Sequence, residues 1–569
     1  MGDFTLDGPV GTRAAAWRLI SDVDELARLG GLPPLVYRYE RTAEGFGALR
    51  GMLLGPAGIR HAFEEHEHGW ERGRRIWQHR RIDGPLLVSA GFRGTVVPVE
   101  GGFVPRLQFS AEPRGVLASP GVALLVGGLR RQWRRILHGQ GDEPRRRLDA
   151  ESRAALDRWR RRGAPEDLVA RFQDWVELAP DADLRDLRPL RWAAQWGMDP
   201  DETLGWLLEG SIAGLVELVF VVRCPACAAA TARVARLSRL DEGADCAACG
   251  QHFLVDLRDH VEVRMIALPR LAPPEHESWA TMLPRARPEV EAMTSVPAHA
   301  SRTLEVDLRP GAWRLGAGGA TASAVVLAAP DAAAEATWSV GDDTPIRVGA
   351  GTVSLHVHNP GSRPVRVVLV SADAAQDRLS AARLATFPTF RGVFGVQALA
   401  PGVYLRVSRV SLLVTDLVAS QGLYEAVGDR SALAFVDAHL REAERVVTRA
   451  GGVRVKSVGD SFVAAFEQPE AAAAAAMQLQ ADYPRWAMAQ AVSDAPGLRI
   501  GVACGAALAA HSDAAGLDWF GGTANHAVMA ARGIAAGEIG LTPSVAAVAS
   551  VEEPWGSEER PGLTVLRRT

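Results

Sequence analysis

Hydrophobic and polar positions repeat with two different periods along this chain of 569 residues. Near the start, apolar residues recur at helical spacing through residues 17–29, and a longer helical pattern covers 116–137. Segments that alternate apolar and polar residues lie between them, at 35–39, 75–78, 86–89 and 107–110. A period of two is typical of half-buried strands, and a period near 3.6 of amphipathic helices. The pattern therefore predicts an α+β domain over residues 1–142.

The order of elements in residues 1–142 resembles the START-like helix-grip fold: a helix, antiparallel strands and a long final helix. That resemblance implies an apolar cavity able to hold a small ligand, and a packed domain without a ligand is the alternative. Residues 143–218 have a helical pattern, and 190–218 resembles a small winged-helix element. Arginine runs at 145–147 and 160–162 have acidic neighbours, so we interpret them as solvated faces and not as a nucleic-acid surface.

Four of the five cysteines form two C-x-x-C pairs separated by 18 residues. Four thiolates at this spacing are typical of a tetrahedral zinc site without an open ligand position. Residues 219–265 are therefore predicted to form a zinc ribbon around a structural Zn²⁺, which replaces the core that so small a unit lacks. A redox pair is the alternative for a single C-x-x-C motif. The predicted zinc ligands are Cys224, Cys227, Cys246 and Cys249.

The second half of the chain changes pattern three times. Residues 268–300 are rich in proline and predict a linker. Short strands broken by Gly and Pro predict a small β-sandwich over 298–372, and a helical connector over 376–403 follows it. From residue 404 to 569 the pattern becomes strand, helix (431–449), hairpin, Ala-rich helix (470–480) and strand, which predicts a second α+β domain.

Composition narrows the classes of function. Apolar residues make up 47% of the chain, enough for several packed domains, and the net charge of −4 gives no basic field for nucleic acid. The start lacks the charged and apolar regions of a signal peptide. The most apolar stretch, 204–222, contains Glu209 and Glu217, so we expect no membrane partner. Few cysteines, most of them clustered, fit a reducing compartment, and we expect a cytoplasmic protein.

The candidate chemistry centres on a predicted hairpin at residues 452–463. Its turn presents Asp460, and its first strand carries Lys456, the only lysine among 63 basic residues. A compact ammonium differs from a guanidinium fork where a single acceptor must be met. A survivor of codon bias is the alternative. A second carboxylate, Asp416, follows the apolar strand 407–415, and two such carboxylates suit a pair of hard cations that hold a triphosphate.

Three segments resemble the motifs of class III adenylate and guanylate cyclases: 411–420 the first metal motif, 451–466 the second, and 518–525 the segment that binds base and ribose. The resemblance covers about residues 404–545, in matching order. It implies a ferredoxin-like cyclase domain at the C-terminus of a multidomain α+β chain. The upstream regions also resemble those of a subgroup of bacterial cyclases.

The resemblance implies a role for each matching residue. Asp416 and Asp460 would bind two Mg²⁺ or Mn²⁺ ions, with the Leu417 carbonyl as a further ligand. Lys456 and Asp518 would contact the purine, the ammonium donating to adenine N1 and the carboxylate accepting from the exocyclic amine, which selects ATP.

Asn525 would orient the ribose for attack by its 3′-hydroxyl on the α-phosphorus. The turn after the first strand would lie against the substrate's phosphates, with Leu417, Val418, Ala419 and Ser420 as its residues. Because the family's metal and purine residues come from opposite subunits, a head-to-tail homodimer is implied.

The sequence departs from the family pattern at positions that matter for rate. Ala419 and Gln421 stand where the family has Gly and Thr, and Met529 stands where it has the arginine that stabilises the transition state. Arg532, one turn further on, is the candidate replacement. Arg567 or Arg568 would replace a triphosphate-binding lysine. Two functions therefore stay open: an adenylate cyclase regulated by its upstream domains, or a nucleotide-binding dimerisation module with weak or no catalysis.

Overall fold

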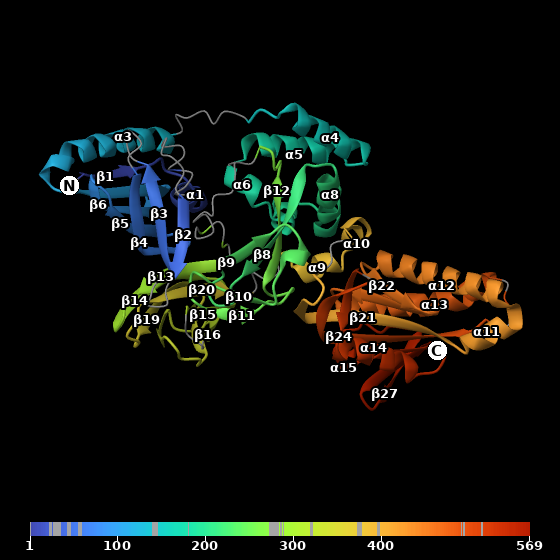
Figure 1. Ribbon diagram of the computed structural model, residues 1–569. Coiled ribbons are helices and arrows are strands. Elements are labelled where there is room, and N and C mark those ends of the chain that lie inside the picture. The colour runs from blue at the N-terminus through green and yellow to red at the C-terminus, as the bar shows by residue number, and fades with distance from the viewer. Residues whose placement is uncertain are drawn as a thin grey trace.

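Three groups of elements follow one another across the computed structural model (Figure 1). A sheet capped by helix α3 lies at one end, a helical and ribbon region lies in the middle, and the C-terminal domain lies at the other end. The structure describes residues 2–21, 26, 36–41, 47–54, 60–138, 146–179, 181–271, 284, 287, 289–318, 323–372, 378–394, 399–490, 492, 495–513 and 516–568.

The first sheet is antiparallel, in the order β2-β3-β4-β5-β6-β7-β1. Its strands are β1 (Gly2–Asp7), β2 (Val36–Arg41), β3 (Gly47–Leu54), β4 (Arg60–Glu71), β5 (Arg75–Asp83), β6 (Leu87–Val99) and β7 (Gly102–Pro113). Helices α1 (Arg13–Ser21) and α3 (Ser119–Leu137) pack on it, and Trp133 of α3 contacts the rings of Phe4, Phe92 and Phe109. The predicted strands at 75–78, 86–89 and 107–110 and the helix at 116–137 are confirmed in substance. Residues 22–25 and 27–35 of the predicted first helix and strand lie outside the described residues.

The predicted linker at 268–300 is wrong in its last third, because Val290–Val296 forms strand β13. This strand pairs with β4 on one side and with β20 (Val365–Ser371) on the other. The first sheet thereby continues through β20, β15 (Gly311–Ala317), β16 (Ser323–Ala329) and β18 (Ile346–Gly349).

A second, three-stranded sheet covers this continuation. It consists of β14 (Ala300–Leu308), β19 (Gly351–Asn359) and β17 (Glu335–Ser339). Both sheets bury alternate residues in one core that includes Leu304, Leu315, Trp338 and Val367. The period-two pattern of this region thus makes two packed layers.

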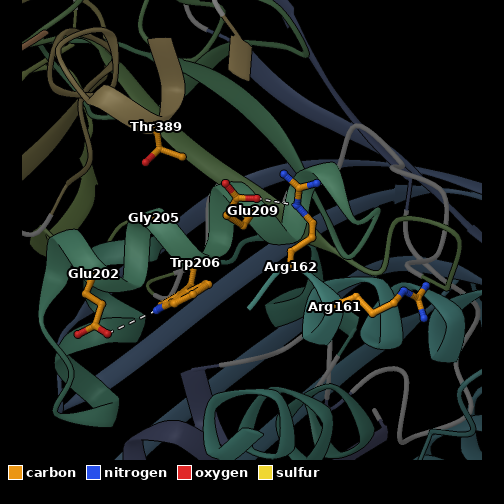
Figure 2. A pocket seen from close by; sticks show the side chains of 7 residues that line it. All are labelled: Arg161, Arg162, Glu202, Gly205, Trp206, Glu209 and Thr389. Atoms are coloured by element: carbon orange, nitrogen blue, oxygen red, sulfur yellow. Dashed lines mark hydrogen bonds and ion pairs between the residues drawn. The ribbon is translucent and has the colours of Figure 1, made fainter. Parts of the chain in front are cut away.

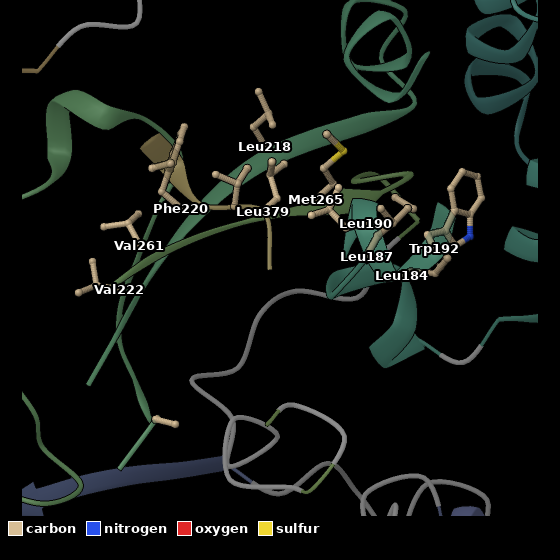
Figure 3. Close-up of a cluster of buried hydrophobic side chains, with 14 of the residues drawn as sticks. Leu184, Leu187, Leu190, Trp192, Leu218, Phe220, Val222, Val261, Met265 and Leu379 are labelled. Atoms are coloured by element: carbon tan, nitrogen blue, oxygen red, sulfur yellow. The ribbon is translucent and has the colours of Figure 1, made fainter. Parts of the chain in front are cut away.

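The middle region begins with α4 (Ala150–Arg161), α5 (Glu166–Leu178), α6 (Asp181–Arg185), α7 (Pro189–Trp196) and α8 (Pro200–Ile212). Strands β8 (Val216–Arg223), β9 (Ala230–Val234) and β12 (Val261–Ala267) follow as one sheet, beside a short hairpin of β10 (Gly243–Asp245) and β11 (His252–Leu254). Figure 3 shows Leu187, just before α7, and Trp192 of α7 on one side of Met265, and Leu379 of the connector between Met265 and Phe220 of the sheet. One apolar core therefore holds the helices, the ribbon and the connector.

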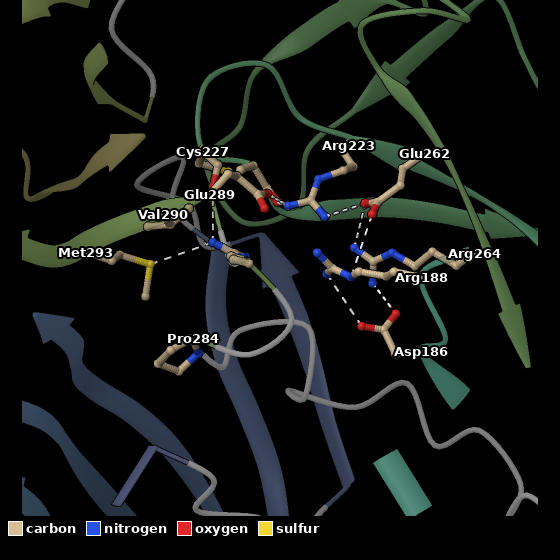
Figure 4. Close-up of polar contacts among 12 residues, drawn as sticks. Asp186, Arg188, Arg223, Cys227, Glu262, Arg264, Pro284, Glu289, Val290 and Met293 are labelled. Carbon is tan, nitrogen blue, oxygen red and sulfur yellow. Dashed lines mark hydrogen bonds and ion pairs between the residues drawn. The ribbon is translucent and has the colours of Figure 1, made fainter. Parts of the chain in front are cut away.

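A buried ionic cluster crosses the same region (Figure 4). Glu262 accepts from Arg223 at 2.8 Å and from Arg264 at 2.7 Å, and Arg223 also pairs with Glu289, just before β13. Burial raises the pKa of the Glu262 carboxyl, but the neighbouring guanidinium groups hold it well below its ordinary value. The members of this ionic cluster are Asp186, Arg188, Arg223, Glu262, Arg264 and Glu289. The charges are paired, as buried charges must be.

The connector forms α9 (Ala381–Ala385) and α10 (Pro388–Phe394) and leads into a sheet of order β22-β23-β21-β24-β26-β28-β27. Its strands are β21 (Tyr404–Val418), β22 (Val453–Val458), β23 (Ser461–Phe466), β24 (Gly497–Ser512), β26 (Glu538–Leu541), β27 (Trp555–Arg560) and β28 (Leu563–Arg568). Strand β25 (Gly516–Phe520) pairs with the end of β24.

Helices cover both faces of this C-terminal sheet. On one face, α12 (Asp429–Arg449), α13 (Pro469–Ala489) and α15 (Pro543–Ala546) pack with Leu413 and Phe462. On the other, α14 (Gly522–Arg532) lies so close to β24 that a Cβ at Gly501 would meet the Ala527 carbonyl oxygen at 2.2 Å. Among the described residues, no helix is both long and apolar enough to span a membrane.

Candidate functional site

The two predicted metal carboxylates lie at the ends of neighbouring strands. Asp416 is near the end of β21, and Asp460 is in the tight turn between β22 and β23. Strands β21 and β23 pair with Thr415 opposite Phe462, so the residue after Asp460 reaches Asp416: the Ser461 hydroxyl donates to Asp416 Oδ1 at 3.1 Å. The chain therefore brings these two carboxylates to one edge of the sheet.

Asp416 has a partner that sequence reasoning missed. Arg499 stands directly opposite it in β24, and its guanidinium donates from Nε at 2.7 Å and approaches with Nη2 at 2.5 Å. The pair is largely buried, with 23% of the Arg499 side chain and 16% of the Asp416 side chain exposed. Arg499 Nη1 also donates to the Arg532 carbonyl oxygen at 3.3 Å. This arginine thus links Asp416 to the end of α14.

The two predicted purine residues are in direct contact. Lys456 Nζ donates to Asp518 Oδ2 at 2.7 Å, and its ammonium also lies 5.3 Å from the centre of the Phe520 ring. The Asp518 side chain is 2% exposed, whereas that of Lys456 is 27% exposed, so the ammonium faces the solvent side of the pair. Asp518 is further fixed by the backbone N–H of Trp519, which donates to Oδ1 at 2.7 Å. The sole lysine of the chain therefore forms an ion pair with Asp518.

Helix α14 carries the residue predicted to orient the ribose and the arginine predicted to stabilise the transition state. Asn525 is in its first turn and Arg532 is its last residue, with Met529 between them. Spacings of four and three residues place all three on one side of the helix. All three are exposed, Met529 to 68%. The apolar side chain therefore occupies the open face where the family pattern has an arginine.

The turn after β21 adopts a backbone that favours glycine. Ala419 has φ +60° and ψ +34°, a left-handed conformation that costs a residue with a Cβ about 1–2 kcal/mol. Leu417 is buried in the core below the turn, Val418 ends β21, and Ser420 begins α11 (Ser420–Val427). The substitution of the family's glycine thus introduces local strain where substrate phosphates are expected.

The two C-terminal arginines have partners in the structure. Arg567 pairs with Glu538 and, at 3.1 Å, with Glu558. Arg568 donates to the Ala481 carbonyl oxygen at 3.4 Å. Neither arginine contacts Asp416 or Asp518 in these interactions, so their predicted phosphate role requires a change of partners.

A buried histidine packs behind β21, the strand that carries Asp416. His439 of α12 is 1% exposed and lies 3.3 Å from the Thr415 hydroxyl, next to Asp416 in the sequence. Burial lowers the pKa of His439 to about 4, so the ring is neutral at pH 7. The rings of Tyr483 and Trp486 enclose it.

The four clustered cysteines come together as the spacing predicts. Their sulfur atoms all lie within 4.8 Å of one another, and all four residues are buried. Hydrogen bonds from neighbouring thiols hold the pKa of Cys227 well below its usual value, and the nearby Arg287 guanidinium acts in the same direction. Four soft sulfur donors in a closed, buried group fit Zn²⁺ and leave no open ligand position.

A separate cavity of about 660 Å³ lies where the helical region meets the connector (Figure 2). Trp206 of α8 and Thr389 of α10 line it, together with Arg161 at the end of α4. Arg162 pairs with Glu209 at its wall, at 2.6 Å. The cavity is open, and none of the predicted site residues lines it.

Comparison with known proteins agrees with the C-terminal motifs. Residues 403–563 match the family described as the adenylate and guanylate cyclase catalytic domain, which confirms the resemblance predicted from sequence. Residues 150–277 match a family of unknown function, DUF5939. No curated protein matches the chain.

Several solved structures are similar over part of the chain. The guanylate cyclase domain of RhGC from Catenaria anguillulae in complex with GTP is 15% identical, with 29% of this chain and 99% of that chain covered and a TM-score of 0.25. The adenylyl cyclase CyaB from P. aeruginosa is 16% identical, over 29% and 95%, with a TM-score of 0.25. Adenylate cyclases from Trypanosoma brucei are 20% identical, over 28% and 88%, with a TM-score of 0.23.

Proposed function

We propose that the C-terminal domain converts ATP to 3′,5′-cyclic AMP and pyrophosphate. The observation that carries this proposal is the contact of Lys456 with Asp518 at 2.7 Å. An ammonium donor beside a carboxylate acceptor complements N1 and the exocyclic amine of adenine. Guanine presents a donor at N1 and an acceptor at O6, so it would meet each group with the wrong polarity. Adenine must open or bridge the direct ion pair when it binds.

Asp416 and Asp460 are the proposed ligands of two Mg²⁺ or Mn²⁺ ions. Their carboxylate oxygens fit hard divalent cations, which when bound polarise the attacking hydroxyl and neutralise the leaving pyrophosphate. The chain's own residues would do the positioning: Asn525 holds the ribose, and the turn around Ala419 lies against the phosphates. Arg499 donates to the Asp416 carboxylate and therefore competes with a cation for the same oxygens.

A homodimer is part of the proposal because apolar side chains are exposed around the site. Leu508 and Phe520 face each other across β24 and β25 and are 40% and 41% exposed, and Val458 in the hairpin is 63% exposed. A cluster of this kind beside a predicted site favours burial against another surface. In a head-to-tail dimer, Asp416 and Lys456 of one chain would serve two different sites.

Regulation by the upstream domains is proposed from two sets of contacts. The ribbon reaches the metal strand directly: the Leu257 N–H donates to the Arg406 carbonyl oxygen at 2.8 Å. The connector contacts β25, the strand that carries Asp518: Arg391 of α10 donates to the Leu517 carbonyl oxygen at 3.0 Å. Burial lowers the pKa of Arg391, and the charge of Asp518 opposes that shift. Movement of the connector would therefore shift Asp518.

Met529 supports a second candidate function. Loss of the transition-state arginine costs orders of magnitude in rate in phosphoryl-transfer enzymes, by about 10³–10⁵ for arginine fingers. Arg532, the replacement candidate, is one turn further along α14. A dimer that binds ATP and signals by contact, with little or no turnover, fits Met529 and the strained Ala419.

The deciding experiment measures cyclic AMP from ATP and Mn²⁺ with the full-length protein. Asp416→Ala should abolish the product, whereas Asp437→Ala, which removes an exposed carboxylate from α12 of the same domain, should leave it unchanged. If the folded wild type and Asp416→Ala are equally silent but both bind ATP, the second function holds. Equal activity in both variants would refute the metal assignment.

A further inference from the structure

The outer face of α3 and of the short turn before it is unusually apolar for a solvent-facing surface. Val116 and Leu117, in the turn Val116–Ala118, are 87% and 98% exposed, and Leu124 in α3 is 77% exposed. Scattered exposed leucines need no explanation, but three within nine residues of one helix end form a patch. These three side chains, here called the α3 tip, expose apolar surface to water, which is energetically unfavourable.

Arginines continue the line of the α3 tip along the helix. Leu124, Arg131 and Arg135 are spaced by seven and four residues, so they point to nearly the same side. The buried side chains of α3 lie on the opposite side and pack on the sheet: Val122, Val126, Leu129, Trp133 and Leu137. One side of α3 is therefore apolar and packs on the sheet. Its other, solvent-facing side (the free side) is apolar at the N-terminal end and cationic at the C-terminal end.

The charge of this free side has one sign. Arg130, Arg131, Arg134 and Arg135 are all exposed, and none forms an ion pair with another residue in the described ranges. No Asp or Glu occurs between residues 114 and 138. Because the whole chain is net negative, this positive stretch is a local feature and not a consequence of composition.

We propose that the free side of α3 binds an anionic lipid surface. The aliphatic α3 tip would insert at the boundary between headgroups and acyl chains, and the four guanidinium groups would pair with lipid phosphates. Nucleic acid is the weaker alternative because the exposed face carries no aromatic ring on which a base could stack. Figure 1 shows α3 at the outer end of the molecule, on the side of its sheet away from the C-terminal domain.

A peripheral lipid contact differs from the expectation of no membrane partner. That expectation concerns segments that span a bilayer, and α3, with its arginines, is not such a segment. A helix that lies in the interface needs only one apolar edge and cationic flanks. Peripheral attachment would place the opposite end of the molecule, with the cyclase domain, away from the lipid (Figure 1).

The test is co-sedimentation of the full-length protein with vesicles of pure phosphatidylcholine or of equal parts phosphatidylcholine and phosphatidylglycerol. We expect binding to the anionic vesicles only, weakened by salt. Arg131→Gln with Arg135→Gln should lower the apparent affinity about thirtyfold. Leu117→Ser with Leu124→Ser should also release the protein while the charge is unchanged.

A matched control uses exposed residues elsewhere. Arg485 and Met488 of α13 are 85% and 82% exposed, and Arg485→Gln with Met488→Ser should bind vesicles like the wild type. Circular dichroism and gel filtration check that each variant is folded. The proposal is overturned if the wild type ignores anionic vesicles, if the control loses binding equally, or if RNA competes and vesicles alone do not bind.

Discussion

The buried His439 gives the structure a specific dependence on pH. Its pKa is lowered to about 4 by burial, whereas an unfolded histidine titrates near 6.5. Below pH 6.5 His439 becomes protonated in the unfolded chain, whereas in the folded domain it stays neutral down to about pH 4. Stability is therefore complete above pH 6.5 and is lost as the pH falls towards 4.

The size of the effect follows from the two pKa values. A difference of about 2.5 units corresponds to about 3 kcal/mol of unfolding free energy below pH 4, and about 2 kcal/mol of it is already lost at pH 5. His439→Gln removes the ionisation and keeps an acceptor for the Thr415 hydroxyl. The variant should start less stable at pH 8 but lose about 2 kcal/mol less than the wild type between pH 8 and pH 5.

Equilibrium denaturation at both pH values measures this difference of differences, so losses common to both conditions cancel. His526→Gln, which changes an exposed histidine of α14, is the matched control and should behave as the wild type. If His439→Gln loses the same free energy on acidification as the wild type, the histidine is not the acid-sensitive group of the domain. The account of a neutral ring behind Thr415 would then be wrong.

Three further predictions test separate parts of the account. Ala419→Gly should relieve left-handed strain of about 1–2 kcal/mol, less the entropy of a freer unfolded chain, and should raise the Tm by about 2 °C in calorimetry; an unchanged or lower Tm contradicts it. Arg499→Gln should tighten Mn²⁺ binding about tenfold by titration calorimetry, because a guanidinium competes for the carboxylate, whereas Arg454→Gln at an exposed pair should not; equal or weaker binding argues that Arg499 organises the site instead. Cys224→Ser should remove zinc in elemental analysis and lower stability, while Cys504→Ser keeps the metal; zinc retained in the first variant removes the ribbon assignment.

Local patterns predicted the elements of the C-terminal domain well. The hairpin around residues 452–463 and the helix of 431–449 appear as β22, β23 and α12, because turn residues and apolar periodicity are local signals. The Ala-rich helix was predicted to end at residue 480 but continues to Ala489 with Pro484 inside it. Packing of its small side chains outweighs the local effect of proline.

Contacts between distant segments could be predicted only in part. Lys456 and Asp518 are 62 residues apart, and the resemblance to a family, not periodicity, placed them together. Arg499 was missed because alternation shows which side a residue faces but not which residue stands opposite it. The pairing of β13 with β4 joins segments about 220 residues apart. The segment before β13 is rich in proline, so composition predicted a linker where the structure has a strand. Strand partners this far apart in the sequence are known only once the fold is known.

The most direct test of the central claim gives the full-length protein equal amounts of ATP and GTP with Mn²⁺ and identifies the cyclic product. Cyclic AMP is the expected product, because Lys456 and Asp518 present a donor and an acceptor that fit adenine. Lys456→Glu should reduce the cyclic AMP without unfolding the domain. Cyclic GMP as the main product, or no cyclic nucleotide from a folded dimer that binds ATP, would contradict the claim.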